Sequence, residues 1–244
     1  MFKVLRKTSR MYAENIKLSL LFSVFTVFSM FLLPLLSSHV SAGAGFVRFS
    51  SLILDITPVQ AMVFLVVGVV STLFLAFSVA ALVSIVKVKE TLDEAGFRKV
   101  VNVFPNYISR VFIFFLVMLL IAVLAGVGLA AIGMPLAVVQ LVIVLLWLAV
   151  IFTPQVIVLE NFSIGKSLSD ALQFIKNSPK ALAEYIAVGF ILILAVLAVE
   201  VSLGQIFVWE HRVVSLLLVS FFVLPFLQMY ATELYIKRYP VSHM

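Results

Sequence analysis

The chain has 244 residues, of which 64% are hydrophobic and only 11% are charged. Soluble domains are typically about 45–50% apolar and about 25% charged, and a small domain leaves a large part of its surface in water. The composition therefore excludes a soluble enzyme, a disordered chain and a nucleic-acid-binding domain, although the net charge is +6. The sequence contains no cysteine, which excludes disulfides and thiol catalysis.

An all-α membrane protein is the fold class that this composition predicts. A helix needs about 20 mostly apolar residues to cross a bilayer, and six stretches of the sequence satisfy this condition. The predicted spans cover approximately residues 18–36, 58–86, 111–132, 135–159, 185–203 and 213–236. We expect these six transmembrane helices to form a single integral membrane domain over residues 1–244.

The basic residues predict how the spans are oriented. Of the 17 Lys and Arg residues, 15 lie before the first span, between the second and third, between the fourth and fifth, or after the sixth. Arg48 and Arg212 fall on the opposite side. Because short cytoplasmic loops carry an excess of Lys and Arg, we expect a multi-pass protein of the cell membrane with both termini in the cytoplasm.

A cleaved signal peptide is the alternative interpretation of the N-terminal segment. Val40, Ser41 and Ala42 follow a basic region and an apolar run, as a cleavage site would. The apolar run is about 19 residues long, however, whereas that of a signal peptide usually has about 7–15. We therefore expect the first span to be retained.

An internal repeat relates the spans to one another. Asn106 and Asn177 each precede a span and are 71 residues apart, and Pro154 and Pro225, inside the following spans, have the same separation. The shared register predicts three helical hairpins, over about residues 1–88, 89–160 and 161–244. Each hairpin begins with a basic segment that precedes its first span.

The leading segment of the third hairpin is amphipathic. Its apolar residues recur at i, i+4, i+7, i+8 and i+11 from Ile164 to Ile175, so they share one face of a helix. Such a helix can lie in the membrane interface and contact anionic headgroups, or it can act as an elbow that orients the next span. The candidate headgroup contacts on the cytoplasmic side are Lys166, Lys176, Lys180, Arg98 and Lys99.

Ionisable residues inside a bilayer are costly and often mark function, but in this sequence they lie away from the span centres. Glu200, in the fifth span, is the deepest, and its expected partner on the outer side is Arg212, His211 or Arg48. This pair is either a structural ion pair or part of a substrate site. Glu160 ends the fourth span. Glu233 precedes Lys237 by four residues, which favours an ion pair along the helix.

The sequence lacks the residue patterns of the familiar hydrolases and nucleotide-binding proteins. It contains no His-Glu-x-x-His pair for zinc, no Gly-x-Ser-x-Gly elbow and no Gly-x4-Gly-Lys phosphate loop. Its histidines, His39, His211 and His243, are scattered along the chain. We therefore expect no catalytic residues, no metal and no cofactor.

Residues 153–194 resemble a known membrane domain. They read Thr-Pro-Gln-Val-Ile-Val-Leu-Glu, then Ser-Ile-Gly-Lys-Ser-Leu-Ser-Asp-Ala-Leu, then Lys-Asn-Ser-Pro-Lys before an apolar span. This run is similar to the membrane domain of the glycerophosphoryl diester phosphodiesterase superfamily and of related six-span integral membrane proteins of archaea and bacteria. The resemblance covers about 40 residues and implies a six-helix fold associated with membrane lipids. It implies no catalytic residues, because the family's phosphodiesterase activity belongs to a separate soluble domain.

These observations favour a non-enzymatic membrane protein that binds or organises lipids, or an accessory subunit of a membrane assembly with an unidentified protein partner. The basic leading segments and the uncharged span centres support this hypothesis. The alternative is a permease-type transporter of a small solute that uses Glu200.

Overall fold

The computed structural model describes residues 2–35, 58–92, 94–204 and 211–239, and the part of the chain that it describes contains helices and turns but no strand. The predicted cleavage site at 40–42 and Arg48 lie outside these residues. The helices are α1 (Phe2–Glu14), α2 (Ile16–Leu35), α4 (Pro58–Leu92), α5 (Phe97–Val103), α6 (Pro105–Ala131), α7 (Leu136–Ala149), α8 (Thr153–Glu160), α9 (Ile164–Asn177), α10 (Pro179–Gly204), α11 (His211–Leu218), the π-helix η1 (Val219–Val223) and α12 (Leu224–Arg238).

Long apolar helices dominate the fold. Within the described ranges, five helical stretches are long and apolar enough to cross a membrane, and a sixth is obtained if α1 and α2, which meet at 88°, are counted as one bent span. This result confirms the all-α class and is compatible with a polytopic membrane protein, with five to six candidate spans where the sequence predicts six. The 35 residues of α4 extend for about 52 Å at 1.5 Å per residue, well beyond a hydrocarbon core of about 30 Å.

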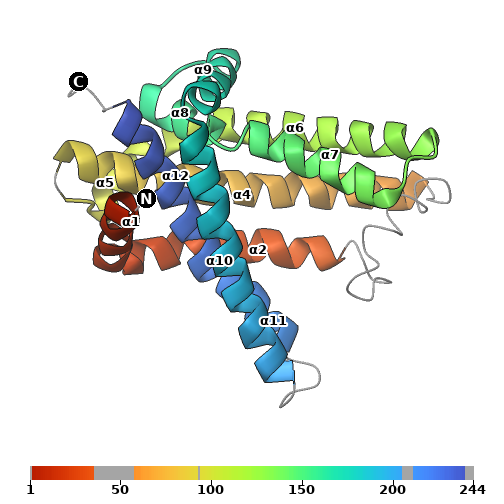
Figure 1. Ribbon diagram of the computed structural model, residues 1–244, viewed down its shortest axis with the longest axis horizontal. Helices are drawn as coiled ribbons and strands as arrows, with labels where there is room; N and C mark the ends of the chain where they lie inside the picture. The colour runs from red at the N-terminus through yellow and green to blue at the C-terminus, as the bar shows by residue number, and fades with distance from the viewer. Residues whose placement is uncertain (1, 36–57, 93, 205–210, 240–244) are drawn as a thin grey trace.

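The helices form two diverging arms that share one end (Figure 1). α2, α4, α6 and α7 run side by side, whereas α10 and α11 leave this layer at a steep angle. The short helices α1, α5 and α9 and the C-terminal end of α12 gather where the arms meet. We call this region the basic end, because Lys and Arg residues of α1, α5 and α9 lie there.

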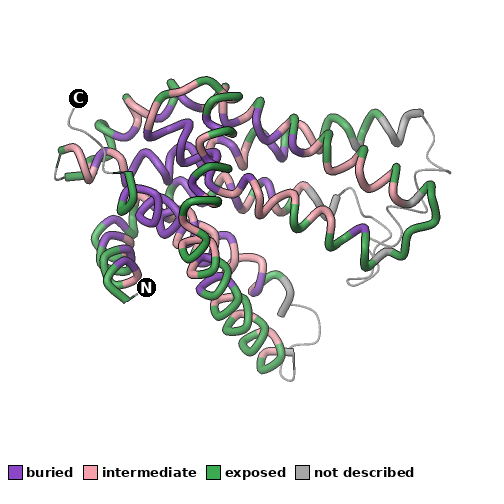
Figure 2. Tube along the Cα trace, turned by 45° about the horizontal axis from the view of Figure 1, so that its top comes forward, coloured by how far each residue is buried: buried purple, intermediate pink, exposed green. Residues whose placement is uncertain are grey.

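Burial is concentrated at the basic end. Buried residues cluster where the arms meet, and the arms themselves are mostly exposed or half-buried (Figure 2). Large apolar side chains such as Leu124 in α6, Leu145 in α7 and Phe190 in α10 are 55–61% exposed. Exposed apolar surface of this extent is unfavourable in water, so hydrocarbon is the environment that suits the two arms.

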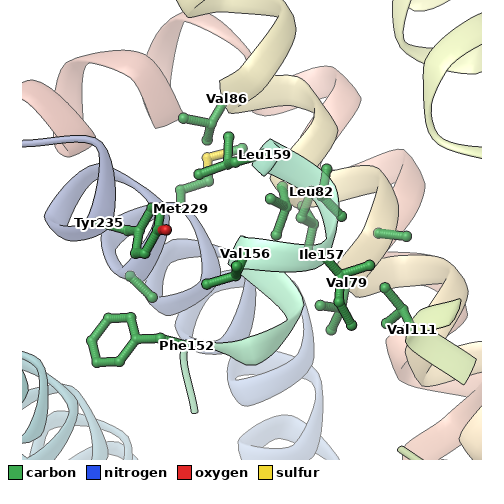
Figure 3. Close-up of a cluster of buried hydrophobic side chains, with 14 of the residues drawn as sticks. Val79, Leu82, Val86, Val111, Phe152, Val156, Ile157, Leu159, Met229 and Tyr235 are labelled. Carbon is green, nitrogen blue, oxygen red and sulfur yellow. The ribbon is translucent and has the colours of Figure 1, made fainter. Parts of the chain in front are cut away.

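The short helix α8 lies at the centre of the buried cluster. Each residue from Thr153 to Leu159 is buried, although the helix has only eight residues. Val156 and Ile157 lie among Val79 and Leu82 of α4 and Met229 of α12 (Figure 3). α8 therefore joins the first arm to the C-terminal helix.

An irregular turn precedes a proline at two places in the chain. Pro154 and Pro225 are each the second residue of a helix, α8 and α12, and each follows a distorted turn. Proline has no N–H to offer the carbonyl four residues earlier. For Pro225 that carbonyl belongs to Phe221 in η1, and it accepts a hydrogen bond from the Tyr12 hydroxyl of α1 at 2.8 Å.

A second polar side chain provides hydrogen-bond donors to the backbone oxygens in the irregular turn before α8. With its amide in the orientation that satisfies both of its polar atoms, Gln155 donates to the backbone oxygens of Ile151 and Phe152 at 3.0 and 3.1 Å. Its oxygen then lies 2.9 Å from Gln228 Oε1 of α12, and the Gln228 amide must be turned as well so that its nitrogen donates to Gln155. The two helices that follow prolines are therefore joined through their glutamines.

Small residues allow α2 and α4 to approach each other closely. Hydroxyl pairs connect the two helices: Thr26 Oγ1 lies 2.6 Å from Ser78 Oγ, and Ser29 Oγ lies 2.9 Å from Ser71 Oγ. Ala80, nearby on α4, is completely buried. In hydrocarbon, small residues and short hydrogen bonds are the main source of helix association, because lipid provides no hydrophobic driving force.

We expect Ala80→Leu to destabilise the fold by about 1–3 kcal/mol, because three added carbons overpack a completely buried position. The matched control is Ala187→Leu on the exposed face of α10, which should change stability by less than about 0.5 kcal/mol. Unfolding in detergent, followed by circular dichroism, measures both. Equal effects of the two substitutions would contradict the packing described for α4.

Candidate functional site

The five predicted headgroup residues are exposed at the basic end. Arg98 and Lys99 lie on α5, Lys166 and Lys176 on α9, and Lys180 at the start of α10. Lys99 Nζ reaches the carbonyl of Glu94 at 3.5 Å, and Lys166 Nζ lies 3.3 Å from the centre of the Phe162 ring. None of the five forms an ion pair with another described residue. Their charges are therefore available to a partner outside the chain.

Other basic residues of the same end have internal partners. Lys87 Nζ donates to the backbone oxygens of Val158 and Leu159 at 2.6 and 3.0 Å and to the Tyr107 hydroxyl at 3.0 Å. The last carbonyls of a helix have no intrahelical donor and carry partial negative charge. Lys87 therefore caps the C-terminus of the buried helix α8.

Arg110 fixes the turn between α8 and α9. Its guanidinium donates to the backbone oxygens of Asn161 and Phe162, both at 3.0 Å, and to Asn161 Oδ1 at 2.6 Å. Asn161 has φ = 56°, a left-handed conformation that asparagine tolerates at a helix end. Glu160, a predicted candidate, is the half-buried last residue of α8 beside this turn, and it forms no ion pair with a described residue.

An ionic contact that the sequence analysis missed holds α1 on the bundle. Lys7 Nζ lies 2.8 Å from Glu90 Oε1 of α4 and 2.9 Å from Glu233 Oε2 of α12. The Glu233 side chain is only 3% exposed. The predicted Glu233–Lys237 pair is therefore wrong, because a buried carboxylate needs a cation beside it and Lys237 is exposed on the outside of α12.

The pKa values of α1 reflect these contacts. Burial alone would lower the pKa of Lys7, but the hydrogen bonds and charges of Glu90 and Glu233 outweigh it and raise that pKa above its usual value. Hydrogen bonds from Arg10 and Lys89 hold the pKa of the Glu14 carboxyl below its usual value. Burial raises the pKa of Tyr12 to about 12.

Glu200 lies in the wall of a pocket far from the basic end. The pocket has a volume of about 260 Å³ and lies between α2, α10 and the segment formed by α11 and η1. Its lining includes Met30, Ile193, Val196, Leu197, Glu200 and Ser220. The side chains of the three predicted partners of Glu200, Arg212, His211 and Arg48, lie outside the described residues.

No protein-family model matches the chain, and neither does any curated protein or any solved structure. The resemblance to the phosphodiesterase-associated membrane domain therefore stays a prediction.

We expect Lys7→Met to lower the free energy of unfolding by about 1–3 kcal/mol, because it leaves the buried Glu233 carboxylate without its cation. This figure allows for Lys7 itself being about half exposed. Arg10→Met is the control, since its pair with Glu14 is an exposed i,i+4 contact and such pairs contribute little to stability. Adding Glu233→Gln to Lys7→Met should recover part of the loss. Detergent unfolding curves that show no such recovery would refute this account of the contact.

Alkaline pH should release α1 from the bundle. The stabilisation by Lys7 is complete below its unfolded pKa of 10.5 and is lost as pH rises through the higher folded pKa. Tyr12 contributes a further loss of stability between pH 10 and about 12, because its phenol ionises in the unfolded chain at a lower pH than in the folded protein. In Tyr12→Phe this second loss of stability should be absent. The difference in free energy of unfolding between the unsubstituted protein and Tyr12→Phe should therefore become smaller between pH 10 and about 12. A constant difference measured from pH 9 to 12 would contradict the role assigned to Tyr12.

Proposed function

We propose that this chain is a non-enzymatic protein of the cell membrane whose basic end faces the cytoplasm and binds anionic lipid headgroups. One observation carries the proposal: the basic residues of this end fall into two groups. Lys7, Lys87 and Arg110 contact other helices of the bundle, whereas the five predicted headgroup residues are exposed and form no ion pair among the described residues. The second group is not needed to hold the described helices together.

Three hairpins, each led by a short helix, form the proposed architecture. The chain order supports it, because α1, α5 and α9 each directly precede a long apolar helix, α2, α6 and α10. The equivalent placement of Pro154 and Pro225 at the second position of α8 and α12 supports a repeat in the second and third units. In this architecture the basic ends of all three hairpins lie on one side of the membrane.

The leading helices act as elbows in this proposal. In α9, Ala171 and Phe174 are completely buried, and Ile164, Leu168 and Ile175 pack against the same core. Most of the predicted apolar face therefore contacts protein, and an interfacial helix that inserts this face into lipid would have to give up those contacts. Leu172 is still 44% exposed. The headgroup contacts are accordingly assigned to the basic side chains on the outside of the elbows.

The energy of such contacts is sufficient for selective lipid binding. Each Lys or Arg near an anionic membrane surface contributes about 1 kcal/mol, and salt screens the attraction. Five such residues together favour anionic over zwitterionic lipid by a few kcal/mol. An accessory role beside a protein partner would use the same exposed charges, and co-purification from the native membrane distinguishes it from lipid binding.

A permease-type transporter of a small solute is the second candidate. It is supported by the position of Glu200 in the wall of a pocket between helices. Solute flux in proteoliposomes that depends on Glu200 would favour this candidate over the lipid-binding one.

We expect neutralisation of Lys176 and Lys180 to Ala together to reduce the excess of anionic lipid retained by the purified protein about tenfold or more, since about 2 kcal/mol of attraction is removed. Lipid mass spectrometry after mild solubilisation measures the ratio of anionic to zwitterionic lipid.

Two controls accompany this measurement. The double change of Lys176 and Lys180 to Arg keeps the charge and should retain the lipid, and Gln173→Ala changes an exposed uncharged residue of α9. Equal lipid ratios in the Ala and Arg proteins would refute headgroup binding at these lysines.

A further inference from the structure

The pocket at Glu200 has the chemistry of a binding site for a cation with an apolar tail. Glu200 is the charged residue among the side chains that line it, and no basic residue occurs in the described lining. A carboxylate beside apolar walls is stabilised when a positive charge takes a place next to it. The lining therefore favours a positively charged group and disfavours phosphate and carboxylate groups.

The apolar part of the pocket extends along α10. Ile193, Val196 and Leu197 line it on the same helix as Glu200, and Met30 of α2 lies in its wall. From Ile193 to Glu200 the helix rises about 10 Å. The volume of about 260 Å³ is below the usual range for drug-sized ligands, about 300–1,000 Å³, so one short alkyl chain fits and a two-chain phospholipid does not.

The π-helix contributes a second polar group. Val219 and Ser220 of η1 line the pocket, and π-turns inside α-helices frequently occur at functional sites. Ser220 Oγ is buried and has no hydrogen-bond partner in the described part of the chain. A buried hydroxyl without a partner is uncommon in native proteins, and rotation about its Cα–Cβ bond would let Ser220 accept a hydrogen bond from a ligand in the pocket.

We propose that this pocket binds a single-chain amphiphile with a primary amine, whose ammonium group pairs with the Glu200 carboxylate and whose alkyl chain lies along Ile193, Val196 and Leu197. The pocket lies between the apolar helices α2, α10 and the α11–η1 segment, so the amphiphile enters from the hydrocarbon rather than from water. This proposal rests on the placement of the helices in a membrane but not on the headgroup binding proposed for the basic end. The basic end is positively charged and lies at the other end of α10, whereas the pocket contains a carboxylate.

Photolabelling tests the proposal. The full chain is placed in nanodiscs of zwitterionic lipid and exposed to octylamine that carries a diazirine at the end of its chain, or to the matching octanoate. Peptide mapping should locate the amine label on α10 and the α11–η1 segment, and excess octylamine should suppress it. Octanoate should label these helices about tenfold less. Equal labelling by the two probes would overturn the proposal.

Charge and shape are then tested separately. Glu200→Gln should reduce amine labelling about tenfold, as expected for the loss of a charge-assisted hydrogen bond, whereas Glu94→Gln, an exposed carboxylate of the basic end, should leave it unchanged. If Glu200 serves only an ion pair with Arg212, Glu200→Gln destabilises the protein without any specific amine labelling in the native chain, and the proposal fails.

Two separate substitutions to tryptophan test the proposal even if Glu200→Gln does not fold. Leu197→Trp fills the pocket and should abolish amine labelling, and Leu194→Trp, at a residue of α10 with nearly the same exposure (47% against 48%), should not. Neutralisation of Lys176 and Lys180 should leave amine labelling intact, so failure of the headgroup proposal can be distinguished from failure of this one. Equal labelling of the two Trp proteins would overturn the amine site.

Discussion

A helix that breaks inside an apolar bundle must find new partners for the carbonyls that it frees, because neither lipid nor neighbouring apolar side chains can supply a donor. This requirement explains the positions of several polar side chains. The Phe221 carbonyl, freed by Pro225, is bonded by Tyr12. The carbonyls at the break before α8 are bonded by Gln155, and those at its end by Lys87. These side chains provide donors to backbone carbonyls at both ends of α8, whose residues from Thr153 to Leu159 are buried.

The same requirement changes the interpretation of the positive charge. A count of Lys and Arg residues treats each of them as a topology signal, but Lys87 and Arg110 also hold the C-terminus of α8 and its turn into α9. Lys7 neutralises a buried carboxylate. A basic residue at a helix end with free carbonyls can therefore both orient the span in the membrane and donate to those carbonyls. Some of the basic residues have internal partners in the structure, and others face outwards.

The helices were predictable from the sequence and most of the side-chain contacts were not. Hydrophobic runs and prolines predict the long helices and both breaks, because these are local properties of the chain. The contact between Lys7 and Glu233 joins residues at opposite ends of the sequence, and Glu233 has a suitable partner only four residues away in Lys237. Burial decides between the two partners, and burial depends on how α1 folds back over α12. The pairing of Gln155 with Gln228 joins residues 73 positions apart, although the prolines near these residues had already indicated that the segments are related.

The π-helix connects the two regions that the proposals concern. Phe221 accepts the hydrogen bond from α1, and the preceding residue, Ser220, lines the pocket that contains Glu200. A π-turn has one more residue than a regular helical turn, and Pro225 removes a hydrogen bond that would otherwise hold it in regular form. The contact with Tyr12 takes the place of that bond. The shape of the pocket on one side of η1 is therefore tied to the docking of α1 on the other, because both depend on the same five-residue segment keeping its wide turn.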